Sequence, residues 1–213
     1  MSEPFVFQTE RHLVVLTGRK ARNLPELLDH IINVSGSSIF YHTHYLHLTQ
    51  HFVKPRFNSE FADWTSYALQ EERLAEQLAA IDMLAMTSIH NLRDAIVAVV
   101  RNYVDVHPLF RECPRGDEFH FCEAKSFVMP TGLVAETVPA FFQQIPNITN
   151  ASLHFHFFEA RLRLERPTND FSQWLTTFGE TKIAKRIDQL NPYAMTLDEL
   201  KAEIGRMGRK YLR

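Results

Sequence analysis

Histidines gather in one short stretch of the sequence. The segment SSIFYHTHYLHLTQHF, residues 37–52, contains His42, His44, His47 and His51. The last three of these fall near one face of an α-helix, and zinc accepts three nitrogens and a water. Seven helical residues nevertheless span about 10 Å, which separates His44 from His51 too far for a good tetrahedron, and no HExxH pattern is present. A divalent transition metal at His44, His47 and His51 is therefore the minor alternative to surface or half-buried histidines.

A second polar run, FFEARLRLERPTND, occupies residues 157–170 directly after His156. Guanidinium groups suit phosphate and carboxylate, so arginines converging on a histidine would form an anion or carboxylate site. The competing interpretation is a solvated helix face, in which acidic and basic residues pair four positions apart. With the histidine that recurs in the first half of the chain, the candidate ligand-binding residues are His42, His156, Glu159, Arg161, Arg163 and Asp170.

The two halves of the chain resemble each other. Residues 5–44 align with residues 119–158 at a constant shift of 114, and a tryptophan recurs further along, at Trp64 and Trp174. Such self-similarity is the signature of a repeated structural unit. The sequence therefore predicts a tandem duplication.

The predicted boundary lies in the segment DVHPLFRECPRGDE, which belongs to neither copy and contains two prolines and a glycine. The first repeat is thus predicted at residues 1–104, the linker at 105–118 and the second repeat at 119–213. Each repeat has about 100 residues, the size of a small domain. We expect the two repeats to be related by an approximate two-fold axis.

The elements that position these residues follow from local patterns. FVFQ and HLVVL have the apolar content of short strands, and Thr17–Gly18 supplies a turn. Asn23 with Glu26, and Thr196 with Glu199, have the spacing of a helix N-cap and its capping box. Each repeat is predicted to be a short β-hairpin followed by four to five helices, which gives a predominantly helical α+β fold.

Residues that recur in both repeats are expected to serve the fold. His42 and His156 are an identical ionisable pair, best explained by a buried imidazole that donates a ring N–H to a carbonyl or carboxylate, with a shared polar site as the alternative. Trp64 and Trp174 are expected in the cores, because a tryptophan buries a large apolar area.

Composition limits the classes of partner. The chain has 213 residues, a net charge of −2 and a pI near 6.6, which disfavours nucleic acid and anionic lipid as partners. Neither a leader pattern nor an apolar run long enough to span a membrane is seen, and Cys113 and Cys122 lack CxxC spacing. We expect a cytoplasmic protein with reduced thiols that acts without a membrane.

A family resemblance is carried by several motifs together. SLHFHFFEARLRLERPTNDFSQWL in the second repeat, SSIFYHTHYLHLTQHFVKPRFNSEFADW in the first, and FHFCEAKSFVMPTG between them resemble a bacterial and archaeal family of unknown function, DUF5752. The resemblance covers essentially the whole chain. It implies a duplicated cytoplasmic module and brings no activity with it.

Two classes of function follow from the sequence. The favoured one is a non-enzymatic interaction, regulatory or ligand-binding module, for a protein or small-molecule partner and with no cofactor expected. The alternative is a metal-dependent or acid/base enzyme that uses the histidine-rich segment or the histidine, glutamate and arginine group of the second repeat. No Walker loop, GxSxG or GxGxxG pattern supports the alternative.

Overall fold

The computed structural model describes residues 3–45, 56–83, 85–164 and 168–212. Helices predominate, and two long strands form an antiparallel sheet. The prediction of a predominantly helical α+β fold is therefore confirmed. Among the helices in these residues, none has the length and apolar character needed to cross a lipid bilayer.

The two strands are β1 (Phe5–Ala21) and β2 (Phe119–Ala135), each 17 residues long. The predicted hairpins are wrong, because Thr17–Gly18 lies inside β1 and the strand pairs with β2 instead of folding back on itself. Gly18 has a φ of 78°, a conformation that costs glycine little and is found at strand irregularities. The Thr17 hydroxyl donates to the carbonyl of Phe121 at 2.8 Å, so this position joins the strands.

Similar helices follow each strand. After β1 they are α1 (Leu24–Asn33), α2 (Gly36–Phe40), the π-helix η1 (Tyr41–Tyr45), α4 (Glu60–Tyr67), α5 (Glu72–Ala79) and α6 (Ile89–Val106). After β2 they are α7 (Val138–Gln144), η2 (Ile145–Asn147), α8 (Asn150–His154), the π-helix η3 (Phe155–Glu159), α9 (Ala160–Leu164), α10 (Asp170–Thr177), α11 (Thr181–Asp188), η4 (Pro192–Ala194), α12 (Leu197–Gly208) and η5 (Arg209–Tyr211).

Side-chain caps begin several of these helices. Asn23 accepts the amide hydrogen bond of Glu26 at 3.0 Å, as predicted. The Glu26 carboxylate accepts from the amide of Arg22, one residue before the cap. At α12 the predicted capping box is confirmed, with Thr196 and Glu199 each binding the other's backbone N–H.

The chain divides into two compact units, and unit 1 combines residues from the start of the chain with its second half. Among the described residues, unit 1 consists of 3–11 together with 126–212, and unit 2 consists of 12–125. β1 therefore gives its first residues to unit 1 and the rest to unit 2. The predicted repeat boundaries at 104 and 119 stay a prediction from the sequence. In the structure, the opening residues of each repeat pack against helices of the other repeat.

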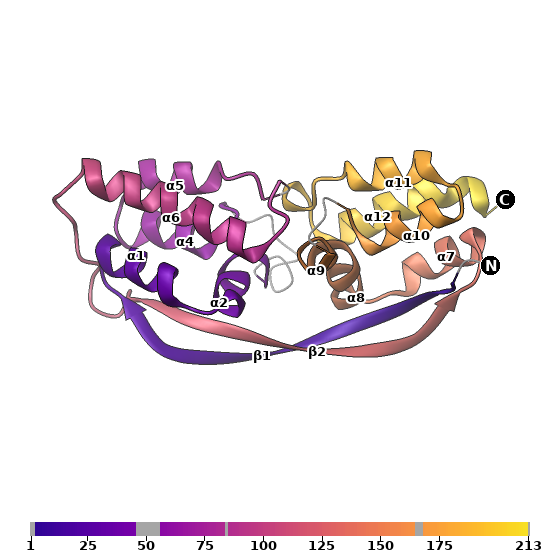
Figure 1. The fold of residues 1–213 in the computed structure, drawn as a ribbon, viewed down its shortest axis with the longest axis horizontal. Helices are drawn as coiled ribbons and strands as arrows, with labels where there is room; N and C mark the ends of the chain where they lie inside the picture. The colour runs from indigo at the N-terminus through magenta and orange to yellow at the C-terminus, as the bar shows by residue number, and fades with distance from the viewer. Residues whose placement is uncertain (1–2, 46–55, 84, 165–167, 213) are drawn as a thin grey trace. The chain divides into compact units, whose positions relative to one another are not determined.

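The core of unit 1 shows this exchange. The start of β1 lies beside α7, one of the helices that follow β2 (Figure 1). Phe5 and Phe7 belong to this part of the strand. The Phe7 ring stacks on Phe141 of α7 with centroids 5.6 Å apart, and Phe5 lies 5.6 Å from Phe171 and 5.7 Å from Trp174 of α10. The opening strand of one repeat thus completes the core of the other.

Unit 2 has the reciprocal arrangement. Phe119 of β2 stacks on Phe61 of α4 at 5.2 Å and meets Trp64 edge-on at 5.6 Å. Phe121 is fully buried in the same cluster. Trp64 and Trp174 are 2% and 8% exposed, which confirms their predicted place in the two cores.

Candidate ligand-binding site

His156 joins the first strand to the helices of unit 1. It lies in the π-helix η3, where only 3% of its surface is exposed. Its Nε2 accepts the backbone N–H of Gln8 at 2.8 Å, and its Nδ1 lies 2.8 Å from Oδ2 of Asp170. Because a backbone amide can only donate, Nε2 must carry the lone pair and Nδ1 the proton that goes to Asp170.

His42 makes the same bonds in unit 2. Its Nε2 accepts the backbone N–H of Cys122 at 3.0 Å, and its Nδ1 donates to Oε2 of Glu60 at 2.5 Å. Glu60 aligns with Asp170, so the sequence difference between the repeats preserves the carboxylate. The predicted buried imidazole with a fixed partner is what the structure contains in both units.

These bonds leave little chemistry to the two histidines. Each ring nitrogen already has a hydrogen-bond partner, so neither imidazole presents a lone pair to a substrate or a metal in this arrangement.

The two tryptophans act beside the histidines as further anchors. The indole N–H of Trp174 donates to the carbonyl of Glu3 at 2.8 Å, and that of Trp64 donates to the carbonyl of Asp117 at 2.6 Å. Both acceptors lie two residues before a strand, so the recurring residues fasten the strands.

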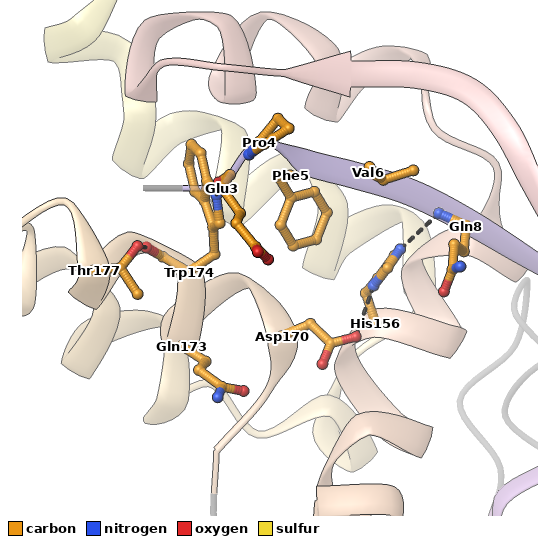
Figure 2. Close-up of a pocket in the computed structure, with 10 residues that line it drawn as sticks. All are labelled: Glu3, Pro4, Phe5, Val6, Gln8, His156, Asp170, Gln173, Trp174 and Thr177. Carbon is orange, nitrogen blue, oxygen red and sulfur yellow. Dashed lines mark hydrogen bonds and ion pairs between the residues drawn. The ribbon is translucent and has the colours of Figure 1, made fainter. Parts of the chain in front are cut away.

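A cavity of about 470 Å³ opens beside these anchors in unit 1. It is bounded by the start of β1, by His156 of η3 and by one face of α10 (Figure 2). Its lining residues are Glu3, Pro4, Phe5, Val6, Gln8, His156, Asp170, Gln173, Trp174 and Thr177. This volume is within the range of small-molecule sites.

The charge of the cavity is negative. Glu3 and Asp170 are its carboxylates, and no lysine or arginine is among the lining residues that the structure describes. Phe5 and Trp174 add aromatic surface, while Gln173 and Thr177 add neutral polar groups. Such a lining favours a ligand with a cationic or hydrogen-bond-donating group next to a small apolar part.

The structure separates the predicted ligand residues of the second repeat. Only His156 and Asp170 line the cavity. Arg161 is 7% exposed, donates from Nη2 to the backbone carbonyl of Asp188 at 3.1 Å and lies over the ring of Phe157. Arg161 therefore contacts α11 and is not among the residues that line the cavity beside His156. The side chain of Arg163 lies outside the described part of the structure, so the predicted anion site stays a prediction.

Glu159 belongs to a different group of side chains. It lies with Glu10, His12 and His154, and one potential ligand atom of each is within 4.8 Å of the others. His154 Nδ1 is 2.9 Å from Oε1 of Glu10, and both side chains are fully buried. The His-x-His motif drew attention to His156, but nothing in the sequence pointed to Glu10. Glu10 is far from His154 along the chain, and the two meet because the start of β1 packs with the helices that follow β2.

The predicted metal residues are only partly described. His44 is 2% exposed in η1, with its ring 5.6 Å from that of Phe40, and it does not belong to the Glu10 group. His47 and His51 lie outside the described residues. A metal at His44, His47 and His51 therefore stays a prediction.

Both thiols of the chain and the phenol of Tyr41 are less acidic than usual. Burial, followed by the charge of Glu60, raises the pKa of Cys122, and burial also raises the pKa of Cys113. Burial and the nearby Glu60 raise the pKa of Tyr41 to about 12. Reactive cysteines have a lowered pKa, so Cys122 does not have the environment of a catalytic thiolate.

Comparison with known proteins gives a family and a structural relative. The model of a family described as "Family of unknown function (DUF5752)" matches residues 2–209. The structure of OrfY from Thermoproteus tenax matches with a TM-score of 0.84 and 29% sequence identity, over 98% of this chain and 95% of that one. No curated protein sequence matches.

Proposed function

The chain belongs to the DUF5752 family, whose function is unknown, and we propose that it is a non-enzymatic module that binds a small cationic molecule in the cavity of unit 1. The observation that carries this proposal is the cavity's lining, which combines Glu3 and Asp170 with the aromatic rings of Phe5 and Trp174. A cation near an aromatic face gains about 0.5–2 kcal/mol, and a carboxylate adds a charge-assisted bond.

The engagement of His156 argues for binding without catalysis. A general base needs a free lone pair within reach of the substrate proton, and Nε2 of His156 already accepts from Gln8. The acid/base alternative has one contact in its favour, the 2.8 Å bond between His156 and Asp170. That bond orients the imidazole toward the strand, which fits a residue that fastens the fold.

The duplication is part of the same proposal. β2 begins 114 residues after β1 and has the same length, and the histidine and tryptophan anchors recur in both units. We infer two copies of one ancestral unit. The predicted two-fold relation between the repeats and the predicted cytoplasmic location stay predictions.

Tryptophan fluorescence tests the binding proposal. In the variant Trp64→Phe, Trp174 is the remaining tryptophan of the chain, and it lines the cavity. Putrescine and choline are the cationic probes, and glutarate is an anion of similar size. We expect a saturable change in emission with the cations and none with glutarate.

Two carboxylate variants locate the response. Glu3→Gln in the Trp64→Phe background should weaken cation binding at least tenfold, because it removes a lining charge while the backbone carbonyl that holds Trp174 remains. Glu136→Gln, an exposed carboxylate of unit 1 outside the cavity, should leave it unchanged. Equal binding of glutarate, no response to either cation, or equal affinity in Glu3→Gln and the parent would overturn the proposal.

A further inference from the structure

A second group of unit 1, away from the cavity's lining, carries metal-binding atoms. Glu10 comes from β1, His154 ends α8 and Glu159 ends η3. None of the three lines the cavity. Their potential ligand atoms, together with that of His12 two residues after Glu10 in β1, all lie within 4.8 Å of one another. His154 Nδ1 and Glu10 Oε1 are 2.9 Å apart.

The π-helix explains how two of these residues meet. His154 and Glu159 are five positions apart, which in an α-helix would turn their side chains about 140° away from each other. In a π-helix the repeating bond joins residues i and i+5, so these positions come close to one face. Residues 155–159 form such a segment, and it places Glu159 over His154.

Charge and burial favour a cation among these groups. The side chains of Glu10 and His154 are both fully buried, and Glu159 is half-buried. Two carboxylates and an imidazole are thus brought together at one largely buried place. A buried carboxylate is costly unless it is neutralised or bound to a metal.

We propose that unit 1 binds one divalent transition-metal ion through Glu10, His154 and Glu159, with zinc as the type. Imidazole with carboxylates is a ligand set that zinc accepts, at about 2.0–2.2 Å from each donor. Donors at these distances and tetrahedral angles are about 3.4 Å apart, so the spread of up to 4.8 Å closes by a small inward movement. The half-buried Glu159 is the ligand with room to move.

The aligned positions of the first repeat do not repeat these three ligands. A shift of 114 residues replaces His154 by Phe40, Glu159 by Tyr45 and Glu10 by Ala124. A π-helix is present there too, at residues 41–45, so the irregular turn belongs to the fold and does not depend on the ligand set. The metal would fasten the start of β1 to η3, whereas the aligned Phe40 and Ala124 are buried apolar residues of unit 2.

Direct metal binding tests the site in the full chain. Protein without a polyhistidine tag, stripped with chelator, is titrated with Zn²⁺ by calorimetry, and bound metal is counted by mass spectrometry. We expect about one equivalent bound at this site, and a Tm that rises with Zn²⁺ concentration because the ion binds the folded state. Less than a tenth of an equivalent bound would overturn the proposal.

Variants assign the bound metal to these residues. Glu159→Gln should weaken zinc binding at least tenfold, while circular dichroism of the metal-free variant should show the wild-type fold, because the buried Glu10–His154 bond stays in place. His154→Asn should remove the site, with circular dichroism to show that the chain is folded. The double variant His47→Gln/His51→Gln should keep full binding. Zinc binding that survives Glu159→Gln but is lost in the double variant would refute the site and favour the histidine-rich segment.

Discussion

Replacing Phe7 by alanine is expected to open helices that lie more than 130 residues further along the chain. The Phe7 side chain is fully buried in unit 1, 5.6 Å from the ring of Phe141, 6.2 Å from that of His156 and 6.5 Å from that of Phe171. Burying a phenylalanine contributes about 1.5–3 kcal/mol by transfer, and its aromatic pairs and the cavity left behind add to that. Phe7→Ala should therefore cost about 3–5 kcal/mol.

Hydrogen exchange read by mass spectrometry shows where this cost falls. In Phe7→Ala, protection should fall in α7 and α10, and amides that exchange through opening of unit 1 should exchange faster by roughly 10² to almost 10⁴-fold. The helices α1 and α4 should keep most of their protection, because their core contains Phe121 and not Phe7.

The matched variant is Phe121→Ala, which removes the same side chain from the aligned position of β2. It should reverse the pattern, since Phe121 lies 6.4 Å from Phe61 of α4 and 5.3 Å from His30 of α1. If Phe7→Ala instead lowered the protection of α1 and α4 and left that of α7 and α10 unchanged, each strand would pack with its own repeat. That result would refute the strand exchange.

Two further predictions concern packing and titration. Gly208→Ala should destabilise the protein by about 1–3 kcal/mol, because the added Cβ would lie 2.1 Å from a ring carbon of Phe142. In the same helix, the Cβ added by Gly205→Ala meets nothing within 4 Å, so this substitution should stabilise the protein by about 0.5–1 kcal/mol. Urea unfolding of the pair measures both, and equal midpoints would contradict the close contact. Cys113 and Cys122 should react slowly with Ellman's reagent at pH 7, and their rates should rise at a higher pH than that of a free thiol, because burial raises both pKa values. Fast labelling of either cysteine at pH 7 in the folded protein would argue against its burial.

Local features of this fold could be predicted from the sequence. The caps at Asn23 and Thr196 depend only on side chains and amides a few residues apart. The burial of His42 and Trp64 followed from their recurrence, because a residue kept in both repeats serves the structure that the repeats share. These inferences needed no knowledge of which elements pack together.

The partners of the strands could not be predicted in the same way. The alternation of Phe5 and Phe7 shows that one face of β1 is buried, but it is the same whether the strand covers its own repeat or the other. Thr17–Gly18 suggested a turn because positive φ is common there, although a glycine inside a long strand satisfies the same preference. The group of Glu10 and His154 was missed for the same reason, since it exists only through the exchange.

The strand exchange also sets the order in which the chain can fold during synthesis. Residues 12–125 supply all of the described part of unit 2, so that unit can close while the helices of unit 1 are still to be made. Phe5 and Phe7 are made before the helices that bury them and must wait for Thr177 at the end of α10, about 170 residues later. At about 5–20 residues per second this interval is about 10–35 s. The start of β1 is therefore buried long after it is made, and its aromatic side chains face solvent or a chaperone until α10 has emerged.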